Sequence, residues 1–262
     1  MEDIFSLKDK IIVVTGGSGN LGTEFTNTLI ACEAKVVVLD ILADEKKSNN
    51  NLRFFKIDIT KKDQIQSSME ILKKEWGIPF GLINNAGLDS PPNSNARSNV
   101  SFEKFPDSDW DRIMEVNLKG SFYCAQIIGS EMAKNNSGSI ININSLYGNL
   151  SPDQRLYSHI DNNGENFFKP FAYGASKSGL VNLTKYLSTY WAKDNVRVNT
   201  MTLGGVYNNQ DEKFVEKYIN KVPMGRMANT NDFRGALIFL LSESSSYVTG
   251  ADIVIDGGFS AW

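Results

Sequence analysis

The stretch Ile-Ile-Val-Val-Thr-Gly-Gly-Ser-Gly-Asn-Leu-Gly, residues 11–22, decides the fold of this chain. Its short, continuous apolar run is typical of a strand buried on both faces of a parallel sheet. Phe25, Leu29 and Ile30 follow the glycines at helical spacing. A strand, a glycine turn and a helix amino end together form a phosphate cradle, because backbone N–H groups can approach a pyrophosphate closely. The stretch therefore predicts a dinucleotide-binding unit.

A second predicted strand, residues 35–40, ends on Asp40, which follows the glycine turn at about the 20-residue spacing of ribose-binding acids. A carboxylate there can bind the adenosine ribose hydroxyls and would repel a 2′-phosphate. Residues 16–22 contain no Lys or Arg that would attract such a phosphate. Asp40 thus favours NAD over NADP. The alternatives are a solvated turn acid, or a phosphate held by Lys46 or Lys47 folding back.

Tyr173 has a lysine, Lys177, four residues after it, and none of the other eight tyrosines does. Apolar residues at helical spacing in residues 172–193 predict that both side chains share one helix face. A phenol titrates near ~10 in water, and a neighbouring ammonium favours the phenolate. The pair therefore indicates an acid/base centre. A packed tyrosine beside an outward lysine is the alternative that the spacing alone leaves open.

Further motifs follow one another along the chain, most of them after predicted strands. They are Asp58-Ile59, Asn84-Asn85-Ala86-Gly87, Asn117 within residues 116–120, Ser145, Val198-Asn199, residues 247–250 and Asp256-Gly257-Gly258. Together with the glycine turn and the Tyr173–Lys177 pair, this order resembles the short-chain dehydrogenase/reductase family, in its compact single-domain branch, over residues 7–258. The resemblance implies an α/β fold, a Rossmann-like doubly wound parallel sheet of about seven strands flanked by helices.

The resemblance also implies a catalytic role for four residues. Tyr173 would be the general acid/base, and Lys177 would lower its pKa and bind the nicotinamide ribose. Ser145 would orient the substrate oxygen, and Asn117 would hold a water that connects the lysine to solvent. A strand-end serine and a buried helix asparagine are the alternatives for the last two.

The cofactor implied by the resemblance is NAD, with NADP possible. Asp58 and Ile59 would flank the adenine, Asn85 would contact the adenosine side, and Val206 would meet the carboxamide. The full set of expected cofactor contacts is Gly16, Ser18, Gly19, Asn20, Leu21, Gly22, Asp40, Asp58, Ile59, Asn85, Ala86, Gly87, Tyr173, Lys177, Gly204 and Val206.

Two short departures from the family pattern affect the cofactor loops. Asn20 stands where a middle glycine is usual, and Asn is the residue that next best tolerates left-handed backbone. Residues 203–205, Leu-Gly-Gly, replace a Pro-Gly pair. This loop is therefore expected to lose one fixed φ and to gain a flexible residue.

Two polar insertions, near residues 89–105 and 149–170, are larger departures. Both leave the carboxyl ends of predicted strands, where ligands bind in open α/β sheets, so we expect them to border the substrate. The second insertion also contributes Lys169. Such polar groups favour a sugar-like or anionic substrate over a steroid or fatty chain, with ordinary solvated loops as the alternative. The candidate substrate contacts are Arg97, Arg155, His159 and, from the opposite side, Asn208.

Length and composition predict one domain over residues 1–262, because strand and helix signals alternate without a linker. A net charge of −3 with dispersed cations argues against a nucleic-acid partner. Residues 1–10 lack an apolar core, and no long apolar run follows, so we expect neither a signal peptide nor a membrane anchor and predict a cytoplasmic protein. Two cysteines and one histidine give no metal-ligand spacing.

The predicted helix over residues 172–193 is apolar on more than one side. Tyr186, Tyr190 and Trp191 remain to be covered after Tyr173 and Lys177 take one face, and another subunit could cover them. The resemblance implies pairing through this helix and through the last strand, so a homo-oligomer, tetrameric or dimeric, is expected.

The predicted function is an NAD(P)-dependent oxidoreductase that interconverts a secondary alcohol and a ketone on a polar small metabolite. A weak likeness to bacterial members tied to surface-sugar synthesis suggests that setting. One alternative is an epimerase or dehydratase, since residues 15–22 have the glycine spacing of the extended branch, although the chain lacks residues for a larger substrate domain. Another is a dinucleotide-sensing protein without turnover, which retention of Asn117, Ser145, Tyr173 and Lys177 disfavours.

Overall fold

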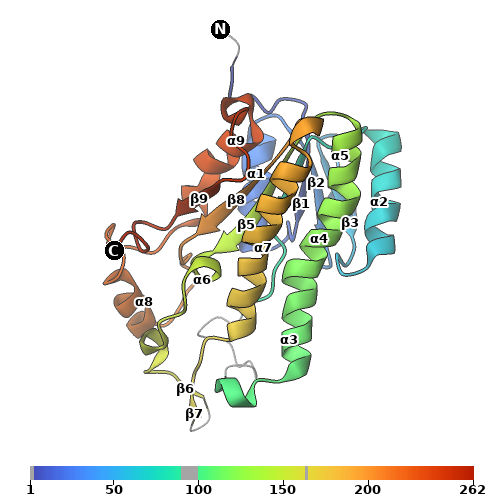
Figure 1. The fold of residues 1–262 in the computed structure, drawn as a ribbon. Coiled ribbons are helices and arrows are strands. Elements are labelled where there is room, and N and C mark those ends of the chain that lie inside the picture. Colours follow the sequence, from blue (N-terminus) through green and yellow to red (C-terminus); the bar gives the residue numbers. More distant parts are fainter. Residues whose placement is uncertain (1–2, 90–99, 163–164) are drawn as a thin grey trace.

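A parallel sheet forms the centre of the protein in a computed structural model that describes residues 3–89, 100–162 and 165–262. The seven strands have the order β3-β2-β1-β4-β5-β8-β9, with helices on both faces (Figure 1). This confirms the predicted doubly wound fold. The strands are β1 (Ile11–Thr15), β2 (Lys35–Asp40), β3 (Leu52–Lys56), β4 (Gly81–Asn84), β5 (Gly138–Ser145), β8 (Val196–Leu203) and β9 (Asp252–Ile255).

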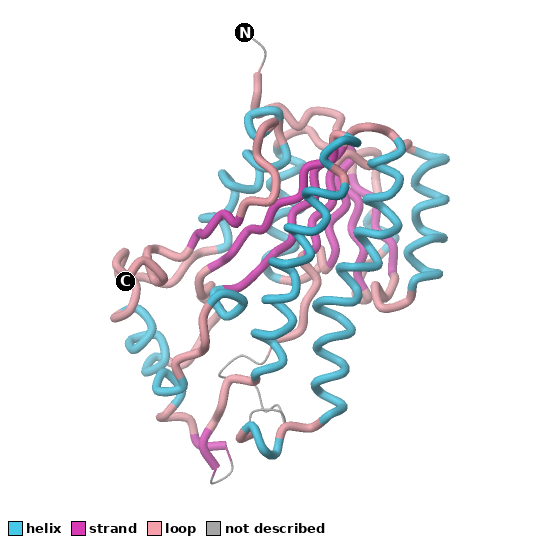
Figure 2. The backbone as a smooth tube through the Cα atoms, viewed as in Figure 1, coloured by secondary structure: helices cyan, strands magenta, loops and turns pink. Residues whose placement is uncertain are grey.

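The helices divide between the two faces of the sheet, as Figure 2 shows with strands in magenta and helices in cyan. Side chains of α2, α4, α5 and α7 pack on one face, and those of α1 and α9 pack on the other. Short π-helical turns over residues 115–120 and 125–129 link α3, α4 and α5. The helices are α1 (Asn20–Ala31), α2 (Lys62–Glu75), α3 (Asp107–Met114), α4 (Ser121–Cys124), α5 (Ser130–Lys134), α6 (Leu146–Asn149), α7 (Phe171–Tyr190), α8 (Glu212–Ile219) and α9 (Arg234–Leu241).

β1 shows why the decisive stretch is continuously apolar. Its residues are all buried, with Ile11 and Val13 in the core on one face and Ile12 and Val14 in the core on the other. Side chains alternate across a strand, so a strand covered on both sides needs an apolar residue at every position.

Trp191 corrects one expectation about α7. Its side chain is buried within the protein's own core, and a Cβ on Gly129 would lie only 2.7 Å from its ring. Trp191 therefore needs no second subunit to cover it. Tyr186 and Tyr190 remain exposed, and their rings stack on each other at 5.8 Å.

The order of the strands brings several loops to one edge of the sheet. β1 pairs with β2 on one side and with β4 on the other, and β5 and β8 follow in parallel register. Because all these strands run the same way, the turns after β1, β4, β5 and β8 meet at their carboxyl ends. Ligands bind at such a switch point in open α/β sheets.

A third apolar cluster lies beyond that edge and joins the second insertion to α8. The insertion contains a 3₁₀ turn, Gln154–Tyr157, and the paired strands β6 (Asp161–Asn162) and β7 (Glu165–Asn166). These elements lie together with α8 away from the sheet in Figure 1. We call the described residues of 149–170 together with residues 205–227 the cap. Its cluster consists of Leu156, Tyr157, Phe167, Phe214, Tyr218, Val222 and Met227.

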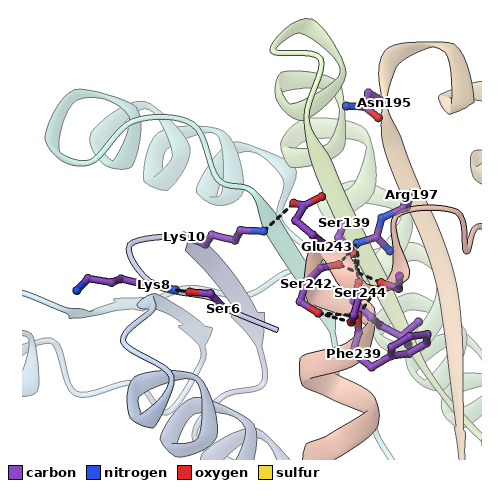
Figure 3. Close-up of polar contacts among 12 residues, drawn as sticks. Ser6, Lys8, Lys10, Ser139, Asn195, Arg197, Phe239, Ser242, Glu243 and Ser244 are labelled. Carbon is purple, nitrogen blue, oxygen red and sulfur yellow. Dashed lines mark hydrogen bonds and ion pairs between the residues drawn. The ribbon is translucent and has the colours of Figure 1, made fainter. Parts of the chain in front are cut away.

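The opposite end of the sheet is closed by polar contacts to the end of α9 (Figure 3). The Arg197 guanidinium donates to the carbonyls of Leu240 and Ser242 at 2.9 and 3.2 Å. Lys10 forms an ion pair with Glu243 at 3.0 Å. Across the described ranges, no helix has the length and apolar character needed to span a membrane. These residues also include no group of three His, Cys, Asp or Glu side chains that could hold a metal ion.

Candidate active site

The glycine turn after β1 is shaped by two close backbone contacts. Gly16 has a φ of +64°, and a Cβ there would lie 2.8 Å from the Ala86 Cα. A Cβ on Gly22 would lie 2.1 Å from the Gly16 carbonyl oxygen. Both positions therefore exclude a side chain, which lets the turn fold tightly onto the first turn of α1.

The amino end of α1 is left open to a ligand. Gly19 is the N-cap residue and its helix end has no side-chain cap, while Ser18, Gly19 and Asn20 are exposed. Such an end presents backbone N–H groups and a positive partial charge to an anion. Asn20 begins the helix and Gly16 carries the positive φ. The tolerance of Asn for left-handed backbone, expected to matter here, is therefore not used.

Asp40 lies beside this turn at the end of β2. Its carboxylate accepts hydrogen bonds from the backbone N–H of Ser18 at 2.9 Å and of Leu42 at 2.8 Å. The acid is therefore fixed next to the phosphate cradle, which fits a role in binding the adenosine ribose. Lys46 and Lys47 are exposed in a neighbouring 3₁₀ turn.

Three other expected cofactor residues also support the backbone around the cradle. The Asn85 amide donates to the carbonyls of Thr15 and Gly16 at 3.0 and 3.1 Å, which ties the glycine turn to the end of β4. Asp58 accepts from the Thr60 backbone N–H at 2.9 Å. The Ile59 side chain is buried in the core, so a contact with adenine would fall to its backbone.

The loop after β8 packs against α8 and against the turn after β9. The Gly205 N–H donates to the Tyr218 hydroxyl at 2.6 Å, and a Cβ on Gly205 would lie 2.7 Å from that ring. A Cβ on Gly204 would meet the Asp256 backbone at 2.8 Å. Val206 forms a bridge with Ala228. The sequence suggested a flexible loop, but close packing is what its glycines permit.

Tyr173 and Lys177 lie on α7 as the spacing predicted. The Lys177 ammonium is buried, lies 5.9 Å from the Tyr173 ring centre and donates to the Ile143 carbonyl at 2.8 Å. A Cβ on Gly87 would lie 3.6 Å from this ammonium. The turn after β4 therefore reaches the same centre.

Asn117 is fully buried in the π-helical turn over residues 115–120. Its amide donates to the Leu88 carbonyl and to the Ser176 hydroxyl, both at 3.0 Å, and its side-chain oxygen accepts from the Leu88 N–H at 2.7 Å. A π turn displaces the backbone from the regular helical pattern and often occurs at functional sites. Here the freed Asn117 carbonyl accepts from Ser121 at 2.9 Å.

Ser145 ends β5 beside Tyr173. Its hydroxyl oxygen accepts from the Tyr147 N–H at 3.3 Å, so its position is fixed by the start of α6. A hydroxyl that accepts in this way can still donate its proton to a substrate oxygen. The four predicted catalytic residues are thus brought together, from β5, α7 and the helical segment before α4.

Burial dominates the ionisation of this centre. It raises the pKa of Tyr173 above its ordinary value, the charge of Asp89 adds to the rise, and hydrogen bonding by Ser145 opposes it. Burial lowers the pKa of Lys177 to about 8, and the charge of Asp89 opposes that change. The expectation that the pKa of Tyr173 would be lowered counted on a close lysine charge together with a bound, positively charged nicotinamide ring. In this structure burial is the largest influence on Tyr173, and it raises the pKa.

A second lysine lies at the same tyrosine. The Lys169 ammonium is 5.1 Å from the ring centre of Tyr173 and 5.9 Å from that of Tyr147, and it pairs with the Asp89 carboxylate at 2.5 Å. The Tyr147 hydroxyl lies 2.9 Å from that of Tyr157. The sequence indicated Lys169 only as one of the polar residues of the second insertion. Its place four residues before Tyr173 was the available signal, but Pro170 separates it from the helix.

The predicted substrate contacts lie in the cap, apart from Arg97, which falls outside the described residues. Arg155 is exposed and pairs with Asp153 at 2.8 Å. The His159 ring nitrogens lie 2.7 Å from the Asp211 carboxylate and 3.4 Å from the Lys217 ammonium.

Asn208 is exposed on the loop after β8. Its backbone N–H donates to the Gln210 side chain at 2.6 Å, and Gln210 in turn donates to the Val206 carbonyl at 2.8 Å. Asn208 is therefore linked through Gln210 to Val206, the residue that is expected to contact the nicotinamide carboxamide.

Comparisons with known proteins agree with this geometry. A family model described as enoyl-(acyl carrier protein) reductase matches residues 17–260. An NAD-dependent glycerol dehydrogenase from Listeria innocua is 30% identical over 266 residues, covering 98% of this chain and 96% of that protein. An NADP-dependent mannitol dehydrogenase from Hypocrea jecorina is 29% identical over 276 residues, covering 98% of this chain and 95% of that protein.

A solved structure extends the likeness to three dimensions. The crystal structure of a short-chain dehydrogenase from Leptospira borgpetersenii with bound NAD⁺ is similar with a TM-score of 0.85 and 32% identity. The match covers 99% of this chain and 96% of that one. With the family match over most of its length, the chain belongs to the short-chain dehydrogenase/reductase family and uses NAD or NADP as its cofactor.

Proposed function

We propose that this protein is an NAD-preferring dehydrogenase that interconverts a secondary alcohol and a ketone on a polyol or sugar. The observation that carries the proposal is the convergence of Ser145, Tyr173 and Lys177 beside a glycine cradle. When bound, the nicotinamide ring supplies or accepts the hydride. The shape of the cradle fits such a group, since side chains on Gly16 and Gly22 would collide with backbone.

Each catalytic side chain has a role that its contacts support. In alcohol oxidation the deprotonated Tyr173 oxygen accepts the substrate proton and becomes the neutral hydroxyl, and in ketone reduction that hydroxyl gives its proton to the substrate oxygen. Ser145 donates a hydrogen bond to the same substrate oxygen. The protonated Lys177 stabilises the tyrosinate that forms during proton transfer, because a neighbouring cation favours the phenolate. The Asn117 side chain holds the backbone of Leu88, next to Gly87, where a Cβ would lie 3.6 Å from the ammonium.

NAD rather than NADP is the preferred cofactor in this proposal. Asp40 stands beside the cradle with its carboxylate fixed by two backbone N–H groups, so a 2′-phosphate would approach a fixed negative charge. The similar glycerol dehydrogenase is named as NAD-dependent, and the similar mannitol dehydrogenase as NADP-dependent.

A polar substrate fits both the relatives and the lining of the site. Two similar proteins are named for glycerol and mannitol, and Lys169, Asp89 and Tyr147 place polar groups beside Tyr173. Arg155, His159 and Asn208 remain candidates for contacts further from the reacting carbon. A setting in surface-sugar synthesis and a cytoplasmic location remain predictions.

The alternative of a cofactor-sensing protein without turnover is disfavoured by the same centre. Sensing needs the cradle, Asp40 and the Lys177 contact to the nicotinamide ribose, but it needs neither an acid/base tyrosine nor a serine that orients a substrate oxygen. In this structure Ser145 lies beside Tyr173 at the end of β5, an arrangement that a binding role alone would not require.

The test is a spectrophotometric assay of NAD⁺ and NADP⁺ reduction with glycerol, xylitol, mannitol, xylonate and 2-butanol. We expect turnover with at least one polyol and a higher kcat/KM with NAD⁺. Tight NAD⁺ binding without reduction by any substrate would favour the sensing role instead. Turnover confined to 2-butanol would retain the oxidoreductase class and reject the polar substrate.

We further propose that the protein assembles as a homotetramer through two faces, the outer face of α7 and the last strand, β9. Tyr186 and Tyr190 stack on α7 and are exposed, which is unusual for two neighbouring aromatic side chains. Light scattering during size-exclusion chromatography should give four times the mass of the 29.1 kDa chain. Tyr186→Glu should lower that mass, whereas a monomeric wild type would reject the assembly.

A further inference from the structure

The ion pair between Lys169 and Asp89 lies at the catalytic centre, yet the proton-transfer mechanism does not use it. The Lys169 side chain is only 4% exposed, whereas that of Asp89 is 42% exposed. The ammonium lies over the rings of Tyr147 and Tyr173. A buried cation therefore lies against the ring of the reacting tyrosine and is paired with an exposed carboxylate.

The backbone of Lys169 is fixed as firmly as its side chain. Its N–H donates to the Gln154 side-chain oxygen at 2.9 Å, and the Gln154 amide donates back to the Lys169 carbonyl at 3.3 Å. Gln154 belongs to the 3₁₀ turn whose Leu156 and Tyr157 pack in the apolar cluster of the cap. The position of the ammonium is thus set by the cap before any ligand binds, as preorganised recognition requires.

Asp89 lies in the loop after β4, and its charge influences the pKa values of the catalytic centre. It acts on the ionisation of Tyr147, Tyr157, Tyr173 and Lys177 alike. The geometric link to the reacting tyrosine is the Lys169 ammonium, which pairs with Asp89 and lies 5.1 Å from the Tyr173 ring centre.

We propose that the Lys169–Asp89 pair is the specificity-determining group of the site, and that it selects neutral vicinal polyols by binding the hydroxyl next to the reacting one. This inference rests on the proposed function. The ammonium donates to that hydroxyl's oxygen, and the carboxylate accepts its proton in a hydrogen bond. One hydroxyl, which both donates and accepts, satisfies both partners of the pair.

The pairing also explains why a neutral substrate is favoured over an anionic one. A lone buried ammonium would attract a carboxylate or phosphate strongly, because the surrounding dielectric is low. Here Asp89 already neutralises the cation, and it would repel a second anion at close range. The sequence left the substrate class open between sugar-like and anionic molecules. The pair favours polyols and sugars that carry no charged group beside the reacting carbon.

Two substitutions separate the roles of the two charges. Lys169→Met keeps a long apolar side chain against the tyrosine rings and removes the donor. Asp89→Asn keeps the size of the more exposed partner and removes its negative charge from beside the lysine. Lys8→Met is the matched control, because it breaks an exposed ion pair with Glu33 outside the site.

The measurement is kcat/KM for xylitol and xylonate with saturating cofactor, together with the NAD⁺ dissociation constant. We expect Lys169→Met to lower kcat/KM for xylitol by about 10- to 100-fold, the effect of losing a hydrogen bond to a charged group. Asp89→Asn should raise the xylonate-to-xylitol ratio by about tenfold or more, because it removes the carboxylate charge that repels an anionic substrate. NAD⁺ affinity should stay unchanged in both variants.

The outcomes distinguish this inference from the function on which it rests. Wild type and Lys8→Met that reduce no cofactor with any substrate would reject the dehydrogenase itself. A wild type that is active on xylitol, with an Asp89→Asn variant whose ratio is unchanged, would reject only the role of the pair. Equal losses on every substrate in Lys169→Met would also overturn it, since they would assign Lys169 to proton transfer. Should Lys169→Met fail to fold, the ratio in Asp89→Asn decides.

Discussion

The cofactor side and the cap of this protein are held together in different ways. On the cofactor side, backbone groups make most contacts: Asp40 binds two N–H groups, and Asn85 binds two carbonyls of the glycine turn. In the cap, side chains bind side chains, as in the pairs of Asp153 with Lys221 at 2.5 Å and of His159 with Asp211 at 2.7 Å.

The difference shows how binding and selectivity are divided between the two regions. Backbone contacts at short glycine turns tolerate changes of most neighbouring side chains, which suits a cofactor shared by many enzymes. Side-chain contacts in a separate small cluster can change without disturbing the sheet, which suits substrate selection. Tyr173 and Lys177 stand between the regions on α7. Substitutions in the two regions are therefore expected to have separable effects.

The largest effect is expected where the two regions meet. Tyr173→Phe keeps the packed ring and removes the hydroxyl, so turnover should fall by about 10²- to 10⁴-fold while cofactor binding persists. Steady-state kinetics and NAD⁺ titration measure both quantities. Tyr247→Phe, at an exposed position, is the control and should be fully active. Substantial activity in a folded Tyr173→Phe protein would contradict the mechanism.

Lys177→Met should lower the activity and raise the stability of the protein, and the gain in stability should depend on pH. The pKa of Lys177 is lowered from 10.5 to about 8, so between these values the unfolded chain binds more protons than the folded one. Stability due to this group therefore rises with pH through that window. The variant should be more stable than wild type at pH 7 by roughly 3 kcal/mol at most, and the gain should vanish towards pH 10.5.

Urea unfolding of both proteins at pH 7 and pH 10 measures this difference. The comparison between the two proteins cancels contributions from the buried tyrosines, which both contain. A stability gain that is the same at both pH values would mean that the lysine is not buried as a charge.

Two glycine substitutions test how tightly the backbone is packed at the glycine turn of the cofactor side. Gly22→Ala places a Cβ 2.1 Å from the Gly16 carbonyl oxygen and should cost about 1–3 kcal/mol of stability and weaken NAD⁺ binding. Gly235→Ala is the matched change in α9, where a Cβ meets nothing within 4 Å, and it should add about 0.4–1 kcal/mol. Thermal unfolding ranks the three proteins, and equal melting temperatures would contradict the tight turn.

Asp40→Ala should relax cofactor choice without affecting the cap. Removing the fixed carboxylate loses a ribose contact and a repulsion, so the NAD-to-NADP ratio of kcat/KM should fall by about 10- to 100-fold. Asp44→Ala removes an equal charge from the neighbouring exposed 3₁₀ turn and should leave the ratio unchanged. A wild type that uses both cofactors equally well would refute the role of Asp40.

The smallest effect is expected in the cap. His159→Ala breaks contacts with Asp211 and Lys217 on α8, and exposed pairs of this kind contribute about 0.2–1 kcal/mol. KM for the polyol should change by less than about fivefold, with NAD⁺ affinity constant. Arg155→Ala should behave similarly. A tenfold or larger rise in KM in either variant would show that the replaced side chain contacts the substrate directly. The role of the cap in substrate selection would then extend to that residue.

Local patterns in the sequence were sufficient for the sheet, the cradle and the acid/base pair. Strand β1 is apolar at every position because both faces are buried, and helix α7 shows the spacing that pairs Tyr173 with Lys177. Asp40 was placed correctly beside the cradle because it follows β2 directly. The apolar run of β1 and the spacing of Tyr173 and Lys177 depend on neighbours within a few residues of one another, where the backbone period alone fixes the geometry.

Only the tertiary structure decided the rest. Lys169 meets Asp89 across 80 residues of sequence, and the insertion packs on α8 through a cluster that extends from Leu156 to Met227. It also decided that Trp191 is covered within the chain. No local period encodes such contacts, because they arise when parallel strands bring distant loops to one edge. The sign of the pKa change at Tyr173 was hidden for the same reason, since burial is a property of the packed molecule and not of the spacing of two residues.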